Sequence, residues 1–556
     1  MAQTRLQRVR GVLLAAACSG GLVAHATAPD LAPALREHLD RLGAHPVVGN
    51  EPLGRPRALE AFYRLGGHRA VWVSAAGRPT DAGRALLEFI RRVAAEGLDP
   101  ADYHAGALER AFAALGRRPG TAAAVVEPEL LLTDAFLQLA GDLSAGRVPP
   151  RRLDPEAGPA SVPVDPIAAL HMALATGEVA ATLRELTPAA PGYASLRAAL
   201  ARYRALEAQG GWPAVPWGPS LRRSDYGTRV ERLRRRLAVT GDLEPAPRAD
   251  AARFDADLEA AVRRFQRRHG LRDDGVVGAA TLAALNVPAD ARVRQIAANL
   301  ERWRWLPEEL GERHVLVNIA GYTLEAVEHG RPALAMRVIV GRPYRRTPVF
   351  SDRIRYLVLN PSWNVPHTIA VEDILPEAQR DPAYLERMGF TVLRGWGENA
   401  EALDPRALDW SRLGPERFPY RLRQEPGPRN ALGRLKFMFP NAHNVYLHDT
   451  PTRALFDRER RGFSSGCIRV ERPLGLAAYL LRARPEWDAD ALRDAIDAGE
   501  TRAVHLEEPV PVHIVYRTAW VDERGVLQLR RDVYERDGAL IGALTGEEET
   551  RADSPG

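Results

Sequence analysis

The chain has 556 residues, of which 46% are hydrophobic and 26% are charged. This length and composition allow large buried cores and predict two to four domains. The formal net charge is only +5, so the basic pI of about 9.3 gives no reason to expect a nucleic-acid partner. Lys436 is the only lysine in the sequence, and we attribute the dominance of arginine to genome composition.

Residues 1–28 predict a signal peptide. Three arginines precede a short apolar run, and small residues follow it as cleavage options. The apolar run is short for a transmembrane helix, so we expect a cleaved leader. If the leader stayed uncleaved, it would hold the protein at the inner membrane. We therefore expect the mature protein to be exported. Cys18 would leave with the leader, so Cys467 would be the single thiol of the mature chain.

Residues 29–222 are expected to form a helical domain. Apolar side chains recur there at helical spacing, and the breaks fall at clusters of glycine and proline. The faces are Leu31, Leu35, Leu39 and Leu42; Leu86, Leu87, Ile90 and Val93; Leu131, Ala135, Phe136 and Leu143; and Leu196, Leu200, Tyr203 and Leu206. No catalytic group assembles among these residues, so we expect a scaffold.

Residues 223–290 predict a small module of three helices. Two helical faces and a third helix after a glycine-rich turn can be read from the apolar positions. They are Val230, Leu233 and Leu237; Leu258, Ala261, Val262 and Phe265; and residues 278–285.

Residues 300–511 change to short, β-branched segments and predict a mainly β domain. Its expected strands include residues 315–319, 334–340 and 353–359. Helices are expected at 474–481 and 489–496. A β extension at 512–546 and a disordered polar tail at 547–556 should follow.

Residues 372–433 interrupt the β pattern with many prolines and glycines. A loop this long inside a compact domain is normally functional, so we expect a lid over the site. The alternative is an excursion with its own small core built on Trp396 and Trp410.

Cys467 and His448 are the residues that indicate a catalytic site. Val445 and Leu447 alternate with Tyr446 and His448, so the apolar pair would enter the core and the other pair would share an open face. An imidazole can take the thiol proton and activate a cysteine nucleophile.

Gly466 precedes that cysteine in the small, polar run FSSGC. A glycine there lets backbone amides approach a carbonyl oxygen, as an oxyanion hole requires, and the Tyr446 hydroxyl could join them. Trp363 is expected either as a buried anchor or as an aromatic wall beside the substrate. Arg469 either holds a substrate carboxylate or forms a salt bridge with a residue such as Glu471.

Two other interpretations of the thiol stay open. A lone buried cysteine is most often an inert small hydrophobe. A metal site from His443, His448 and Cys467 is disfavoured, because positions five apart on a strand face opposite sides. We expect no metal and no cofactor.

The motifs resemble a known family. The pattern HD…SSGCIRV, with NPSWNVP and KFMFPNAHNVYLHDTP before it, is similar to the signature of L,D-transpeptidases of the large periplasmic branch. The commonest family form has His and Asn where this chain has Ser465 and Arg469. EGLDPADYH resembles the helical scaffold of that branch, and VRRFQRRHGL…DGVVGAATLAAL resembles a three-helix peptidoglycan-binding module.

The resemblance implies a multidomain α+β enzyme with a helical scaffold, a peptidoglycan-binding module and a β catalytic domain with a lid insertion. It would form 3→3 cross-links between peptidoglycan stem peptides through a thioester on Cys467, with His448 as base and the Asp449 carbonyl orienting the imidazole. Tyr446 and Gly466 would stabilise the oxyanion. Arg469, Ser465 and Trp363 would contact substrate.

The resemblance leaves the acceptor open. Water would give L,D-carboxypeptidase activity, a free D-amino acid would give exchange, and a lipoprotein lysine would give attachment to the wall. The non-enzymatic alternative is a peptidoglycan-binding scaffold with an inert catalytic domain. Carbapenems would acylate Cys467. The oligomeric state is not indicated.

Overall fold

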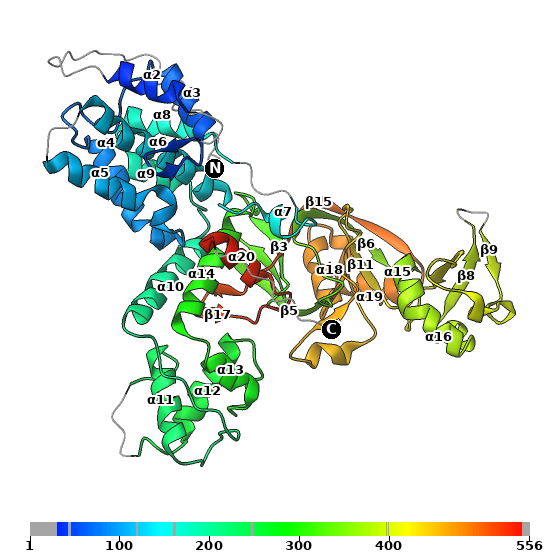
Figure 1. Ribbon diagram of the computed structural model, residues 1–556. Coiled ribbons are helices and arrows are strands. Elements are labelled where there is room, and N and C mark those ends of the chain that lie inside the picture. Colours follow the sequence, from blue (N-terminus) through cyan, green and yellow to red (C-terminus); the bar gives the residue numbers. More distant parts are fainter. Residues whose placement is uncertain are drawn as a thin grey trace. The chain divides into compact units, whose positions relative to one another are not determined.

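The computed structural model describes residues 31–42, 46–117, 121–158, 163–245, 250–395, 397 and 400–546 (Figure 1). The predicted leader, the tail 547–556 and Trp396 lie outside these residues. The chain forms two compact units. One draws on Met1–Pro155, Pro159–Glu309 and Thr518–Gly556, and the other on Glu156–Gly158 and Leu310–Arg517.

The first unit is helical, as its apolar spacing predicts. Helix α6 (Ala122–Ala145) forms the centre of its core, and most of its residues are buried. The buried Glu129 carboxylate accepts hydrogen bonds from the backbone amides of Val71, Trp72 and Val73, which satisfies its charge. The other helices are α2 (Ala32–Asp40), α3 (Pro56–Leu65), α4 (Asp81–Arg92), α5 (Ala105–Arg117), α7 (Pro150–Leu153), α8 (Pro166–Thr176), α9 (Val179–Glu185), α10 (Pro191–Ala208) and α14 (Ala289–Arg304).

Three helices form the predicted small module within this unit. They are α11 (Thr228–Val239), α12 (Ala256–Arg268) and α13 (Ala279–Leu285). Their core contains the apolar residues expected from the sequence. Arg268 and Asp242 form a buried bidentate pair, with Nε–Oδ1 at 2.6 Å and Nη2–Oδ2 at 2.5 Å.

The C-terminal segment differs from the expected β extension. Residues 512–515 belong to strand β15 (Arg502–Val515) of the second unit. A short hairpin of β16 (Ala519–Val521) and β17 (Leu527–Leu529) follows, and the last described element is helix α20 (Arg536–Thr545), not a strand. The spacing of Leu540 and its apolar neighbours is helical, and Leu540 packs in a core with Ala298 of α14.

The second unit is built on a nine-stranded sheet with the order β13-β5-β14-β12-β11-β6-β15-β3-β4. The strands predicted from β-branched residues are confirmed as β3, β5 and β6. Besides β15, the strands of this sheet are β3 (Arg313–Asn318), β4 (Thr323–Glu328), β5 (Arg331–Gly341), β6 (Phe350–Leu359), β11 (Leu435–Met438), β12 (Leu447–His448), β13 (Gly462–Ser464) and β14 (Ile468–Val470). The helices α18 (Pro473–Leu481) and α19 (Ala489–Asp497) belong to the same unit.

The interruption of the β pattern is a folded subdomain and not a loop. Residues 363–424, called the insertion subdomain below, form a separate four-stranded sheet with the order β7-β10-β8-β9. The subdomain has its own core, which includes Trp410. Its elements are β7 (Trp363–Asn364), α15 (His367–Ile369), η3 (Ala370–Ile374), α16 (Leu375–Arg380), α17 (Ala383–Arg387), β8 (Phe390–Arg394), β9 (Glu401–Leu403) and β10 (Tyr420–Gln424).

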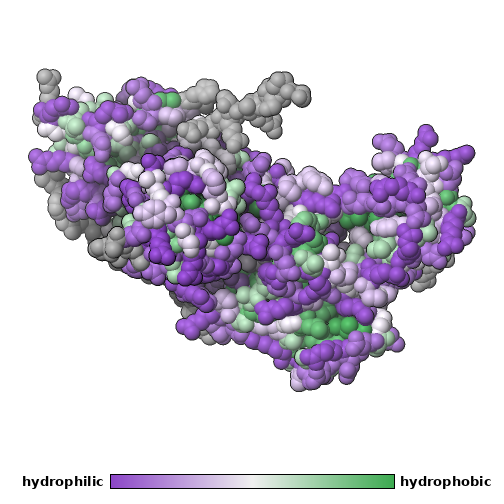
Figure 2. Space-filling view, turned by 90° about the horizontal axis from the view of Figure 1, so that it is seen from below, coloured by the Kyte–Doolittle hydropathy of each residue, from purple (hydrophilic) through white to green (hydrophobic). Residues whose placement is uncertain are grey.

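The surface seen in Figure 2 is mostly hydrophilic, with hydrophobic residues confined to small areas. The structure contains no helix among its described residues that is both long and apolar enough to cross a membrane.

Candidate active site

Three neighbouring strands position the predicted site residues. β12 pairs in parallel with β14, so that His448 lies opposite Arg469, and β11 pairs with β12, so that Lys436 also lies opposite His448. Opposite residues in a sheet point to the same face, and Tyr446 and Cys467 lie two positions before His448 and Arg469. The sheet therefore gathers Lys436, Tyr446, His448, Cys467 and Arg469 on one face.

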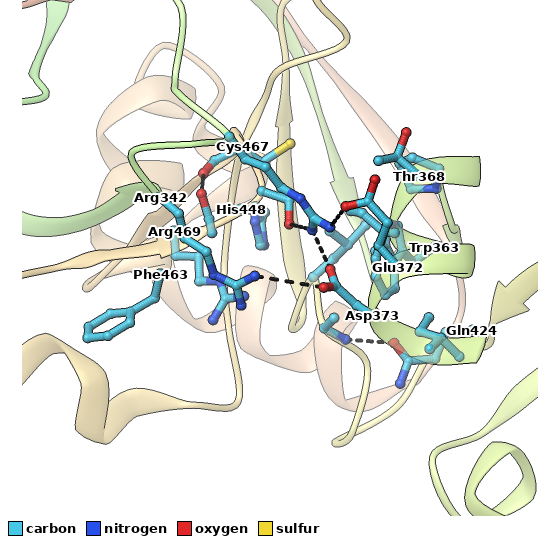
Figure 3. Close-up of a pocket in the computed structure, with 18 of the residues that line it drawn as sticks. Arg342, Trp363, Thr368, Glu372, Asp373, Gln424, His448, Phe463, Cys467 and Arg469 are labelled. Carbon is cyan, nitrogen blue, oxygen red and sulfur yellow. Dashed lines mark hydrogen bonds and ion pairs between the residues drawn. The ribbon is translucent and has the colours of Figure 1, made fainter. Parts of the chain in front are cut away.

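All five of these residues line one pocket of about 1680 Å³ (Figure 3). The insertion subdomain contributes another part of its wall, including Trp363, Glu372 and Asp373. The pocket is large enough for a branched peptide, since small-molecule sites are typically about 300–1,000 Å³.

The turn that carries the thiol, residues 464–467, is held by side-chain hydrogen bonds. Ser464 Oγ donates to the Cys467 carbonyl at 2.5 Å, and the Gly466 amide donates to Ser464 Oγ at 3.2 Å. Thr347 Oγ1 donates to the Gly466 carbonyl at 2.8 Å. Gly466 has a φ of 115°, a conformation that side chains rarely adopt, which explains the glycine.

The Gly466 amide is engaged within this turn, so the oxyanion role expected for Gly466 stays a prediction. The Cys467 amide has no hydrogen-bond partner among the residues that the structure describes. This amide is therefore the backbone donor available to an incoming oxygen.

The Cys467 thiol rests away from the imidazole. Its Sγ donates to the Asn444 carbonyl at 3.9 Å, and Asn444 has a left-handed φ of 53° that presents this carbonyl. Burial raises the pKa of the Cys467 thiol, and hydrogen bonds with Tyr446 oppose that change. The resting cysteine is therefore a protonated thiol at neutral pH.

The His448 imidazole contacts the backbone carbonyl of Asp449. His448 Nδ1 lies 2.5 Å from the Asp449 carbonyl oxygen, which favours the tautomer that carries its proton on Nδ1. The Asp449 side chain is occupied elsewhere, because its carboxylate accepts from the Arg434 amide at 2.9 Å and from Arg453 Nη1 at 3.0 Å. Burial, and then the Arg469 guanidinium, lower the pKa of His448 to about 3.

The two predicted partners share the pocket without touching. No hydrogen bond joins the Cys467 thiol and the His448 imidazole among the described residues. With the thiol pKa raised and the imidazole pKa lowered, both groups are uncharged at neutral pH. The resting site thus holds a thiol and a neutral imidazole on adjacent strands, not a preformed ion pair.

Arg469 is free to meet a ligand. The carboxylate named as its alternative partner, Glu471, is bound instead by Arg337, with Nε–Oε1 at 2.9 Å. Arg469 Nε is buried without a hydrogen-bond partner in the part of the chain described. Arg342 lies close enough to lower the pKa of Arg469, so two guanidinium groups face the pocket together (Figure 3).

Arg345 connects the insertion subdomain to the thiol turn. Its side chain forms ion pairs with Glu372 and Asp373 of η3, and its Nη1 donates to Ser465 Oγ at 2.8 Å. Arg342 lies 3.8 Å from Asp373 (Figure 3). Only 11% of the Arg345 side chain is exposed, so these contacts are partly shielded from water.

Trp363 lies between the core of the insertion subdomain and the pocket. It packs on the core of the insertion subdomain and also lines the pocket. Its indole hydrogen bonds with the Tyr446 hydroxyl, whose pKa is raised by burial and by the nearby Cys467.

Sequence reasoning missed four residues of the site: Lys436, Arg345, Thr347 and Asn444. The basic run GRPYRRTP after a strand and the isolated lysine were the available signals. Their positions depend on pairings between segments that are distant in sequence, which no local pattern specifies. The described residues contain no group of three or more His, Cys, Asp or Glu side chains that could hold a metal ion.

A lone thiol and an oriented imidazole on adjacent strands of a β domain are the residue set of cysteine-dependent enzymes. Family models agree with this class. A model described as "L,D-transpeptidase catalytic domain" matches residues 312–512, one described as "Putative peptidoglycan binding domain" matches 226–285, and one described as "Scaffold domain" matches 57–200. Residues 312–512 thus match the catalytic domain of L,D-transpeptidases, and the peptidoglycan-acting domains imply a cell-envelope protein.

A curated relative supports the assignment. A "Putative L,D-transpeptidase" from Haemophilus influenzae is 36% identical over 244 residues, which cover 44% of this chain and 48% of the relative. The match thus spans about half the length of that protein.

Two solved L,D-transpeptidases are also similar. The structure from Xylanimonas cellulosilytica is 17% identical, with 54% of this chain and 99% of that chain covered and a TM-score of 0.16. L,D-transpeptidase 1 of Mycobacterium tuberculosis is 13% identical, with 37% and 61% covered and a TM-score of 0.14.

Proposed function

We propose that this protein forms 3→3 cross-links between peptidoglycan stem peptides through a thioester on Cys467. The observation that carries the proposal is the placement of His448 on β12 and of Cys467 immediately before the neighbouring parallel strand β14, both lining one peptide-sized pocket. The matched catalytic and peptidoglycan-binding domains support the choice of substrate.

The first step is acylation by a tetrapeptide stem. The Cys467 side chain turns from the Asn444 carbonyl toward His448, Sγ attacks the carbonyl carbon before the terminal D-alanine, and the thiol proton passes to His448 Nε2. The Asp449 carbonyl holds the Nδ1–H and so keeps the imidazole in the tautomer that can accept. The bond to D-alanine then breaks, and its amine leaves with the proton from His448.

The oxyanion of the tetrahedral intermediate needs donors at the place where charge develops. The Cys467 amide and the Tyr446 hydroxyl are the candidates, and the Trp363 indole supports the hydroxyl. Arg469 is proposed to bind a substrate carboxylate, because its buried guanidinium has an Nε without a hydrogen-bond partner among the described residues. Ser465 is proposed to contact the bound stem from the thiol turn.

The second step passes the acyl group to the side-chain amine on the third residue of another stem. His448 removes a proton from that amine, the amine attacks the thioester, and Sγ leaves and takes that proton back from His448 as the new amide forms. The insertion subdomain is proposed to act as a lid that excludes water and so favours the amine over hydrolysis. Carbapenems, which carry a strained acyl group, are proposed to acylate the same sulfur.

The test is incubation with muropeptides that contain tetrapeptide stems, with product masses as the readout. The wild-type protein should give a cross-linked dimer. A tripeptide would instead show carboxypeptidase activity, and an exchanged terminal residue would show D-amino-acid exchange. A lysine-linked lipoprotein peptide, offered in parallel, tests attachment to the wall.

The Cys467→Ala variant should form none of these products and should still sediment with isolated peptidoglycan through its matched binding domain. Retained product formation in Cys467→Ala would rule out the nucleophile. Binding without any product from the wild-type protein would favour the scaffold alternative. The periplasm is the proposed location, and a fusion of residues 1–28 to a reporter tests export.

A further inference from the structure

Lys436 is unusual both in the sequence and in the structure. The chain has 76 basic side chains, and all the others are arginine. This lysine lies on β11, directly opposite His448 of β12, and it lines the pocket that contains Cys467. In a sequence that otherwise uses arginine, the position of its single lysine beside the reactive thiol indicates a requirement for an ammonium group.

The surroundings of Lys436 hold no compensating acid. Its Nζ lies 3.8 Å from the centroid of the Tyr446 ring, a cation–π contact. Neither an ion pair nor a hydrogen bond links its ammonium to any residue that the structure describes. The group is largely buried, and burial lowers the pKa of Lys436 while the Cys467 sulfur opposes that change.

A buried cation without an acid is costly unless an anion meets it. Other ionisable groups that line this pocket include the Tyr446 hydroxyl, the neutral His448 imidazole and the guanidinium groups of Arg342, Arg345 and Arg469. Arg345 is neutralised by Glu372 and Asp373. The anion that this geometry can supply is the sulfur of Cys467 after it loses its proton.

We propose that Lys436 stabilises the anionic form of the Cys467 sulfur and so makes the thiol reactive in a pocket whose burial opposes ionisation. The contact with the Tyr446 ring holds the ammonium in the pocket that contains the sulfur, and the bulkier, planar guanidinium is a poorer fit there because its charge is spread over three nitrogens. The relevance of this role to acyl transfer rests on the proposed function. The role itself concerns only the thiol.

The experiment measures the rate of Cys467 alkylation by iodoacetamide between pH 6 and pH 10, with intact-protein mass as the readout. Iodoacetamide is uncharged and reacts with the thiolate, so the midpoint reports the thiol pKa. In Lys436→Met the midpoint should rise by about one pH unit, so the rate at pH 7 should fall about ten-fold and then converge with the wild-type rate at high pH. Lys436→Arg keeps the charge and should show a smaller shift.

Arg355→Met is the matched control, because it removes one positive charge from an exposed position on β6 of the same sheet. Equal midpoints for Lys436→Met and Arg355→Met would overturn the proposal, as would a uniform loss of rate at every pH. Lys436→Gln provides a second neutral variant if the Met variant does not fold. Because alkylation needs no peptide, a shifted thiol with no muropeptide product would reject the proposed function only.

Discussion

The His448 imidazole has a pKa of about 3 because it is buried and because the Arg469 guanidinium lies beside it. An imidazole with this pKa is neutral over the whole range in which the protein would work. The thiol pKa is displaced in the opposite direction by burial. At the residue scale, therefore, the proton moves only during the attack, and the resting site does not store a thiolate.

These protonation states predict how the acylation rate depends on pH. General-base attack needs a neutral imidazole, so the acylation rate should be lost when pH falls toward 3, where the imidazole takes up a proton. The acylation rate should consequently be flat between about pH 5 and pH 8, since an ordinary thiol titrates near 8.5. Stopped reactions followed by intact-protein mass give the profile. An inflection between pH 6 and 7 would show an ordinary imidazole and contradict the prediction.

A second prediction separates the two roles of His448. In His448→Ala, acylation by a tetrapeptide stem should fall by about 10²–10⁴-fold, because the general base is lost. Alkylation of the thiol by iodoacetamide should change far less, since no hydrogen bond joins the resting thiol and imidazole among the described residues. Comparable losses in both assays would mean that the pair already interacts at rest.

At the scale of elements, the strand register brings together side chains that are far apart in the sequence. The parallel pairing of β12 with β14 and the antiparallel pairing with β11 set Lys436, His448 and Arg469 side by side. The loop after β5 then reaches both the thiol turn and η3 through Arg345. A small set of ion pairs thus connects the insertion subdomain to the nucleophile.

Arg345→Met should weaken this connection and admit water. The expected result is a larger share of tripeptide product relative to cross-linked dimer, with the acylation rate reduced by less than about ten-fold, because a partly buried ion-pair network is lost while Cys467 stays in place. Product masses measure the ratio. Arg387→Met removes an exposed ion pair with Asp381 inside the same subdomain and should leave the ratio unchanged. An unaltered ratio in Arg345→Met would contradict the lid role.

At the scale of the whole molecule, the chain leaves the helical unit after residue 309 and rejoins it at residue 518. The returning segment is fixed by buried polar contacts. Arg302 Nη1 lies 2.5 Å from Asp537 Oδ1, and Thr518 Oγ1 donates to Asp537 Oδ2 at 2.8 Å. The C-terminal hairpin and α20 are therefore part of the helical core and not an appendage of the β domain.

Asp537→Ala tests this arrangement. Removing one member of a buried ion pair leaves Arg302 uncompensated and should lower the free energy of unfolding of the helical unit by about 3 kcal/mol. Urea denaturation combined with limited proteolysis should show the helical unit unfolding earlier while the β domain keeps its transition. Asp490→Ala, which breaks an exposed pair with Arg493, should change stability by less than about 0.5 kcal/mol. Equal effects of the two substitutions would contradict the prediction.

The sequence by itself determined the order of the helical scaffold, the three-helix module and the β domain, because hydrophobic periodicity is a local property that a chain displays without its fold. It also singled out Cys467, His448, Tyr446 and Trp363, whose residue types are rare or sit in recognisable patterns. Only the tertiary structure decided that Glu471 pairs with Arg337, that residues 363–424 form a separate sheet, and that Lys436 and Arg345 lie at the site. Those facts depend on strand pairing between distant segments, and a pairing register is fixed by the packing of the whole domain rather than by the residues on either strand.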